Sequence, residues 1–240
     1  MGRVGMITYP FLKKNATIGV TAPSSGVEEE LHELVKRSCS RLEGRGYYII
    51  CRDTAWTQDK AKSAPAVKRA QEFNEMMQDE GIDLILPPWG GELLIEVLEK
   101  IDFENLKEKW VLGYSDTSLL LLAITLKTGI ATAHGTNLID LRGEYTDDTT
   151  AMWESVLSTK TGSTITQYSS EKYQKKWQHD NPSPCVFHLT EETNWKIVTG
   201  ESVKVEGRLL GGCIDIIRHI IGTPYGDVQS FRKKHINNEP

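Results

Sequence analysis

Short apolar segments alternate with amphipathic segments along the first 160 residues of the chain. Apolar segments bounded by Gly, Pro and Ser predict buried strands, and apolar residues at helical spacing predict helices. We expect strands at residues 15–25, 47–51, 82–86, 110–112 and 129–133. We expect helices at 28–42, at 93–100, at 119–126, at 149–157, and one that begins at 63–67. This alternation predicts an α/β fold with a parallel sheet and right-handed crossovers.

The pattern changes after residue 160. Residues 161–184 are polar and lack apolar periodicity, whereas 195–198 and 203–210 read as strands and 213–221 as a helix. We therefore expect an N-terminal α/β domain over residues 1–160, a linker or loop region over 161–184, and a C-terminal domain over 185–240. About 55 residues are few for an independent core, so we expect this second, β-rich domain to be incomplete.

Composition and charge exclude several classes of protein. The chain of 240 residues has a net charge of −5, and it has no long Lys/Arg run that would favour nucleic acid. Its four cysteines lack the paired spacings of zinc or redox sites, so we expect neither metal nor cofactor. No apolar stretch approaches the roughly 20 residues of a membrane span, and no signal peptide is evident. We therefore expect a cytoplasmic protein with no membrane or nucleic-acid partner.

The main candidate for chemistry is the turn Gly113-Tyr-Ser-Asp-Thr117, between an apolar strand and an apolar helix. A serine at such a bend exposes its hydroxyl above the sheet edge, next to the N–H groups of the new helix. Ser115 is then a candidate nucleophile. The alternative is that Ser115 or Asp116 is only the helix N-cap, because both residue types favour that position.

Two other turns belong to the same edge of the predicted sheet. Parallel strands bring their carboxyl ends together, so Pro87–Glu92 and His134-Gly135 should lie beside Gly113–Ser118. Gly90 and Gly91 fit a tight turn alone, or a turn whose bare backbone lets an N–H approach a substrate oxygen. Their position beside Ser115 favours the second interpretation.

Several motifs in order resemble the LD-carboxypeptidase family of serine peptidases. They are Ser63-Ala-Pro-x-x-Lys-Arg-Ala70, Pro88-Trp-Gly-Gly-Glu92, Leu112-Gly-Tyr-Ser-Asp-Thr-Ser118, Thr132-Ala-His-Gly135, Gly207-Arg-Leu-Leu-Gly-Gly212 and Gly222-Thr-Pro224. The Trp-Gly-Gly-Glu version is most similar to the family's microcin immunity branch. The resemblance implies a flavodoxin-like parallel sheet with helices on both faces, and a second domain that closes over the catalytic serine.

The resemblance also implies roles for individual residues. Ser115 would be the nucleophile of a serine carboxypeptidase, and the amides of Gly91 and Asp116 would form its oxyanion hole. We assign substrate binding to Trp89, Gly90, Glu92 and His134. The substrate would carry an amide next to a free carboxylate, either in an acidic aminoacyl-nucleotide conjugate of the microcin type or in a cell-wall tetrapeptide. For the complete protein we expect a homodimer.

The chain also departs from the family pattern. Thr117 stands where a G-x-S-x-G elbow has its second glycine. The family's catalytic Glu and His lie after the Gly-Thr-Pro segment, but only sixteen residues follow Pro224, and His235 and Glu239 do not match the motif positions. We therefore expect a truncated chain without appreciable activity. The alternatives are a non-catalytic small-ligand-binding module and one half of a split enzyme.

Overall fold

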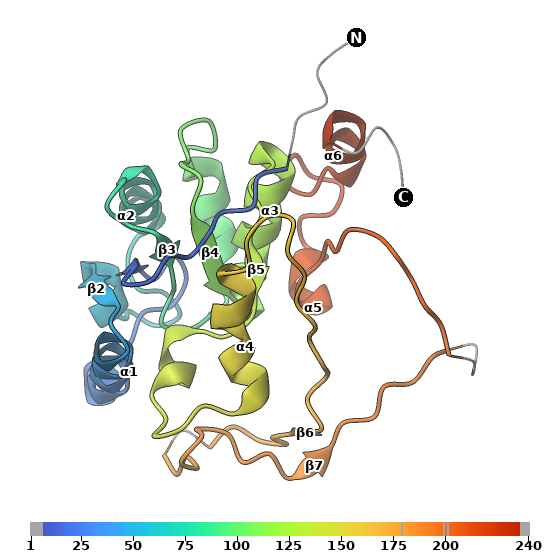
Figure 1. Ribbon diagram of the computed structural model, residues 1–240. Helices are drawn as coiled ribbons and strands as arrows, with labels where there is room; N and C mark the ends of the chain where they lie inside the picture. The colour runs from blue at the N-terminus through green and yellow to red at the C-terminus, as the bar shows by residue number, and fades with distance from the viewer. Residues whose placement is uncertain (1–6, 179, 199, 201, 236–240) are drawn as a thin grey trace.

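Five parallel strands form a sheet at the centre of the computed structural model, which describes residues 7–235 except 179, 199 and 201 (Figure 1). The strands are β1 (Thr17–Val20), β2 (Tyr48–Cys51), β3 (Leu84–Ile85), β4 (Trp110–Gly113) and β5 (Ala133–His134). Their order is β2-β1-β3-β4-β5, and every neighbouring pair is parallel. This order is the flavodoxin-like one, so the predicted fold class is confirmed.

Helices cover both faces of this sheet. The α-helices of the first part are α1 (His32–Gly44), α2 (Ala66–Gln78), α3 (Ser118–Thr128) and α4 (Asp148–Leu157). Short 3-10 helices connect them: η1 (Glu29–Leu31), η2 (Asp53–Trp56), η3 (Leu94–Lys100), η4 (Ser115–Thr117) and η5 (Leu138–Leu141). In the part that the structure describes, no helix is long and apolar enough to cross a membrane.

The core consists of two apolar layers, one on each face of the sheet. Ile85 and Val111 pack with α2, η3 and α3, whereas Leu84 and Leu112 pack with α1, η5 and α4. Neighbouring residues of a strand point to opposite faces, so the central strands β3 and β4 contribute to both layers. Because both faces of β3 and β4 are covered, these two strands are apolar without alternation, which is the pattern from which the sequence predicted them.

Helix α3 is buried almost all round, with eight buried residues among its eleven. It packs against η3 on one side and against α5 (Ile214–Ile217) and α6 (Val228–His235) on the other. A helix without a polar face is stable only when other elements cover it on all sides. The elements around α3 therefore fix the direction of this helix. They also fix the position of the turn that precedes it.

The strands β1 and β3 are shorter than the predicted ranges 15–25 and 82–86, and two other predicted elements differ in position or type. The predicted strand 129–133 is observed as β5, Ala133–His134, because Gly129 adopts a left-handed φ of +80° and ends α3, while Ile130 only bridges Thr8. The predicted helix 93–100 is the 3-10 helix η3.

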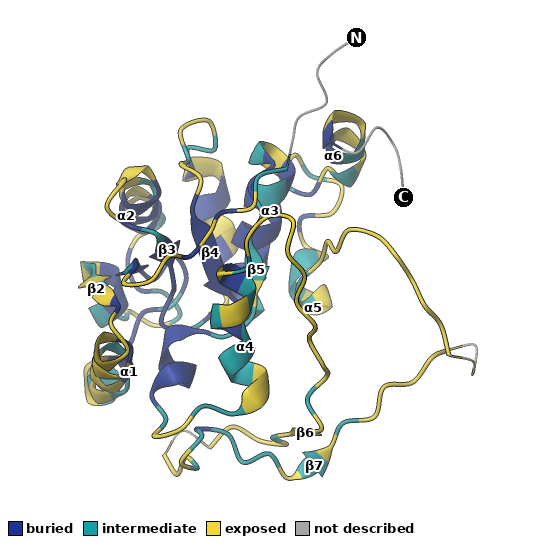
Figure 2. Ribbon diagram, in the orientation of Figure 1, coloured by how far each residue is buried: buried dark blue, intermediate teal, exposed yellow. Residues whose placement is uncertain are grey.

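The second part of the chain differs more from the prediction. Residues 195–198 and 203–210 are not strands, although their apolar pattern predicted them. Val205 and Leu209 are exposed, and strand geometry needs a hydrogen-bonding neighbour that these residues lack in the described part of the chain. The strands observed here are β6 (Lys172–Tyr173) and β7 (Glu191–Glu192). They form a small antiparallel pair in a long, mostly exposed segment (Figure 2).

The predicted helix 213–221 is shorter than expected, and a second helix follows it. α5 ends at Ile217, and α6 follows at Val228–His235, where no helix was predicted. Two features stabilise α6. Basic residues fill its last turn, where they interact favourably with the negative end of the helix dipole, and its Phe231 is buried.

A buried arginine joins the loops that follow β1 and β3. Arg69 of α2 has no exposed surface, although its motif Lys-Arg-Ala reads as an ordinary helix surface. Its guanidinium donates to the carbonyl oxygens of Ala64 (2.8 Å), Pro23 (2.9 Å) and Leu93 (2.9 Å), and it pairs with Glu96. One side chain thereby joins α2 to the loops that follow β1 and β3.

We expect Arg69→Met to destabilise the fold by about 3–5 kcal/mol, because it leaves three carbonyl oxygens and the Glu96 carboxylate without their donor. The matched control is Arg37→Met, which removes only an exposed i,i+4 pair with Glu33 and should cost less than about 0.5 kcal/mol. Urea unfolding followed by circular dichroism measures both. Equal midpoints for the two variants would contradict this role for Arg69.

Candidate functional site

The turn after β4, called the elbow below, bends sharply at Ser115. Tyr114 is extended, with φ −148° and ψ −173°, and Ser115 then adopts a φ of +62° before α3 begins at Ser118. A positive φ is unfavourable for a residue with a side chain, and residues held in it often belong to functional sites. An ordinary N-cap has an extended backbone, so this geometry favours the nucleophile interpretation over the cap.

The glycine turn after β3 lies directly against this serine. A Cβ at position 90 would be 2.8 Å from Ser115 Cβ, 3.0 Å from Ser115 Oγ and 3.1 Å from the backbone nitrogen of Asp116. Only glycine permits this approach without displacing the elbow. The predicted meeting of the turns after β3 and β4 is therefore observed, and Gly90 makes the close contact.

Two backbone N–H groups near the serine have no acceptor among the described residues. The N–H of Asp116 lies in the first turn of η4, where no intrahelical acceptor exists. Gly91 has a φ of +149°, and none of the hydrogen bonds between described residues uses its N–H. A Cβ at position 91 would lie 2.3 Å from Ser24 Oγ and 2.5 Å from Ser25 Oγ, so this position also requires glycine.

The Asp116 side chain fastens three loops of this edge together. Its buried carboxylate accepts hydrogen bonds from Ser24 Oγ (2.5 Å) and from the backbone N–H of Leu94 (2.8 Å). Ser24 belongs to the loop after β1, and Leu94 begins η3 after the glycine turn. Ser25 N–H also donates to the Gly90 carbonyl (3.3 Å). The elbow and both adjacent loops are therefore one connected unit.

The other residues of the glycine turn lie at different depths. Trp89 is half-buried, and its indole N–H donates to the Gly26 carbonyl at 2.8 Å. Glu92 is exposed. Gly90 and Trp89 are thus hydrogen-bonded to neighbouring backbone, whereas Glu92 faces solvent at the same edge.

His134 also lies at this edge, as predicted. It ends β5 and pairs in register with Gly113, two residues before the serine. Its Nε2, however, lies 3.6 Å from Cys213 Sγ, and partial burial lowers the pKa of its imidazole. Among the described residues, no hydrogen bond joins His134 to Ser115.

The remaining described histidines lie in other parts of the fold. His235 packs on Gly129, at the end of α3 opposite to Ser115. His188 contacts the Asn181 carbonyl through Nε2 in the exposed segment that carries β6 and β7, and His32 contacts the carbonyls of Val27 and Trp56. His219 is exposed and follows α5. Within the described part of the chain, no group of three or more His, Cys, Asp and Glu could hold a metal ion.

The structure adds a polar cluster that sequence reasoning missed. Asn137 and Asp140 form a capping box on η5, and Asn137 Oδ1 accepts from the backbone N–H of Tyr114 (3.3 Å). Burial raises the pKa of the Asp140 carboxyl to about 6, and burial and the nearby Asp140 raise the pKa of Tyr114 above its usual value. The Asn-x-x-Asp spacing is a capping signal that could have revealed this cluster.

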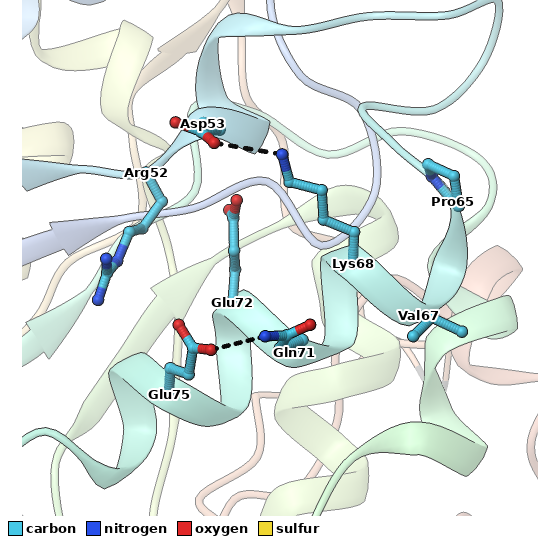
Figure 3. Close-up of a pocket in the computed structure, with 8 residues that line it drawn as sticks. All are labelled: Arg52, Asp53, Pro65, Val67, Lys68, Gln71, Glu72 and Glu75. Atoms are coloured by element: carbon cyan, nitrogen blue, oxygen red, sulfur yellow. Dashed lines mark hydrogen bonds and ion pairs between the residues drawn. The ribbon is translucent and has the colours of Figure 1, made fainter.

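Two surface pockets lie away from the elbow. One, of about 480 Å³, lies between the end of β2 and α2; Asp53 and Lys68 form an ion pair across it (Figure 3). Strands β1 and β3 separate β2 from β4, so this pocket is roughly 14 Å from the elbow across the sheet. The other, of about 750 Å³, lies between α1 and the loops at 142–144 and 182–186.

Comparison with known proteins gives a consistent assignment. Residues 18–135 match the model of the LD-carboxypeptidase N-terminal domain. The chain is 28% identical over 214 residues to the microcin C7 self-immunity protein MccF of Escherichia coli, covering 87% of this chain and 62% of that protein. It is 26% identical over 219 residues to a probable murein peptide carboxypeptidase of Bacillus subtilis, covering 89% and 59%.

The solved structures agree with these relatives. The structure of MccF in complex with glutamyl sulfamoyl guanosine superposes with a TM-score of 0.77 at 26% identity, covering 91% of this chain and 67% of that one. The chain thus spans about three fifths of the length of the two curated relatives named above.

We expect Ser115→Val to destabilise the fold by about 2 kcal/mol relative to Ser115→Ala. A β-branched side chain tolerates positive φ poorly, whereas alanine keeps the volume and strain close to those of serine. Thermal unfolding of the two variants measures the difference. If valine and alanine have the same effect, the backbone at position 115 is not held in this conformation in solution.

Proposed function

Because the chain belongs to the LD-carboxypeptidase family, whose N-terminal domain spans residues 18–135, we propose that it acts in serine-type hydrolysis of an amide next to a free carboxylate. The observation that carries this proposal is the positive φ of Ser115, held against the bare backbone of Gly90. That arrangement directs a hydroxyl outward at the start of a helix, as a nucleophilic serine requires.

In the proposed reaction, Ser115 Oγ attacks the carbonyl carbon of the amide and loses its proton to a base. The carbonyl oxygen becomes an oxyanion, which accepts hydrogen bonds from the N–H groups of Asp116 and Gly91. The C–N bond then breaks, the amine leaves with a proton, and water hydrolyses the acyl-serine. One such oxyanion donor typically contributes roughly 3–4 kcal/mol to transition-state stabilisation.

We propose that the base is a residue that makes none of the contacts described above. No hydrogen bond joins Ser115 Oγ to an imidazole or a carboxylate in the part of the chain that the structure describes. By family resemblance, a Glu and a His of the C-terminal domain would complete the serine. An unassisted serine hydroxyl is a weak nucleophile near neutral pH, so this group decides the rate.

For the substrate we propose an acidic aminoacyl-nucleotide conjugate of the microcin type. The Trp89-Gly-Gly-Glu92 turn supports this choice, as does the similarity to MccF, whose structure holds glutamyl sulfamoyl guanosine. In this proposal, Trp89, Gly90, Glu92 and His134 line the substrate site. The second candidate is a cell-wall LD-peptide, favoured by the similarity to the probable murein peptide carboxypeptidase.

The first activity prediction concerns Ser115→Ala in a polypeptide that joins these 240 residues to the C-terminal segment of the family. We expect kcat to fall by roughly 10⁶-fold on the preferred conjugate, because the nucleophile acts as one unit with its base. A covalent serine probe should label the parent at Ser115 and leave the variant unlabelled. Ser158→Ala, at the exposed end of α4, is the matched control and should keep full turnover.

Retained turnover in Ser115→Ala would exclude the serine mechanism. If the parent hydrolyses neither the conjugate nor the LD-peptide but still binds one of them, the result would support the remaining alternative, a non-catalytic ligand-binding module.

The second activity prediction concerns the 240-residue chain by itself. We expect it to hydrolyse either substrate hardly at all, because no described group is placed to take the Ser115 proton. Oxyanion donors and binding alone can still give about 10³–10⁴ over water, so a trace of turnover agrees with the prediction. Ordinary enzyme rates that Ser115→Ala abolishes would mean that a base lies within this chain, and His134→Ala would then be the first test.

A further inference from the structure

Two cysteines from different elements come into contact at the β2 edge of the sheet. Cys39 lies on α1 and Cys51 ends β2, with eleven residues between them. Their sulfur atoms are 3.8 Å apart, and both thiols are half-buried. The sequence spacing had given no sign of a paired site, because the contact arises only when α1 folds back over β2.

The position of the pair follows from the elements that carry it. Ile49 and Cys51 point toward the helix layer, whereas Tyr48 and Ile50 face solvent. Cys39 is next to the buried Ser38 on the inner face of α1. β2 is an edge strand of the sheet, and both cysteines are partly exposed. Small oxidants therefore have a short path to them.

We propose that Cys39 and Cys51 are an oxidative modification site, at which a peroxide or a small disulfide converts the two thiols reversibly into a disulfide that fastens α1 to β2. A disulfide has S–S of about 2.05 Å, so the sulfur atoms must approach by roughly 1.8 Å. Rotation of the two side chains about their Cα–Cβ bonds can supply a movement of this size.

The pair also has a chemical asymmetry that suits this reaction. The hydrogen bond with Cys51 lowers the pKa of the Cys39 thiol, against the opposing effects of burial and of Glu43, and raises the pKa of Cys51. The thiolate is the reactive form of cysteine. In the proposed reaction Cys39 is the attacking thiol, and Cys51 is the resolving thiol.

With hydrogen peroxide the steps balance as follows. The Cys39 thiolate attacks one peroxide oxygen, the O–O bond breaks, and Cys39 becomes a sulfenic acid while hydroxide leaves and takes up a proton as water. The Cys51 thiol then attacks the sulfenic sulfur, the S–O bond breaks, and a second water leaves. In total, two thiols lose two electrons and two protons, and one peroxide becomes two waters.

The test uses the full 240-residue chain. The protein is reduced, freed of reductant, treated with hydrogen peroxide, and then denatured and alkylated with N-ethylmaleimide. We expect four alkylated cysteines before peroxide and two afterwards, with dithiothreitol restoring four. Digestion with trypsin should release Ser38–Arg41 joined to Gly46–Arg52 from the oxidised monomer.

Stability provides a second readout. Closing this short loop should raise the melting temperature by about 5–10 °C, and dithiothreitol should reverse the rise. Cys39→Ser should show neither the linked peptides nor the rise, whereas Cys213→Ser should show both. Four alkylated cysteines after peroxide, a different pair of linked peptides, or a link found only between two chains would each overturn the proposal.

Discussion

The carboxylate of Asp116 is the interaction on which the candidate site depends. It is buried, and it accepts hydrogen bonds from Ser24 of the loop after β1 and from Leu94 at the start of η3. A buried carboxylate is costly unless such donors surround it, so loops that come apart would leave it unsatisfied. Because Asp116 directly follows Ser115, the same interaction fixes the elbow and the glycine turn relative to each other. Arg69 secures these loops from behind through the carbonyl oxygens of Pro23 and Leu93.

The magnitudes explain why the unfavourable backbone at Ser115 persists. A non-glycine residue in the left-handed region costs on the order of 1–3 kcal/mol. Each hydrogen bond to a charged group contributes roughly 1.5–3 kcal/mol, and Asp116 accepts two of them. The buried helix α3 adds a further constraint, because rotation of its first turn would expose some of its buried leucines. The surroundings therefore outweigh the strain, and the serine is held in place before any ligand binds.

The sequence predicts the features of this site that have local causes. The β3, β4 and β5 turns could be placed at one edge because apolar strands alternate with helices, and Gly90 and Gly91 could be connected to Ser115 for that reason. Arg69 could not be recognised, since a Lys-Arg pair on a helix normally faces water, and its burial depends on three carbonyl groups from distant loops. The strands expected at 195–198 and 203–210 failed for a related reason: apolar alternation forms a strand only beside a hydrogen-bonding partner, and Val205 and Leu209 remain exposed.

The proposed serine hydrolysis has two requirements: stabilisation of an oxyanion and removal of the serine proton. In the proposed mechanism the first depends on Ser115, Asp116 and the glycine turn, all of which the parallel sheet and its loops position. The second needs a base within hydrogen-bond reach. His134 shares the sheet edge, but its Nε2 faces Cys213. His235 packs on Gly129 at the far end of α3, roughly 20 Å from Ser115. Since Asp116 and Gly90 hold the elbow without any contact to a base, the first requirement can be met before the second. A base supplied by another segment would then meet a serine that is already in position.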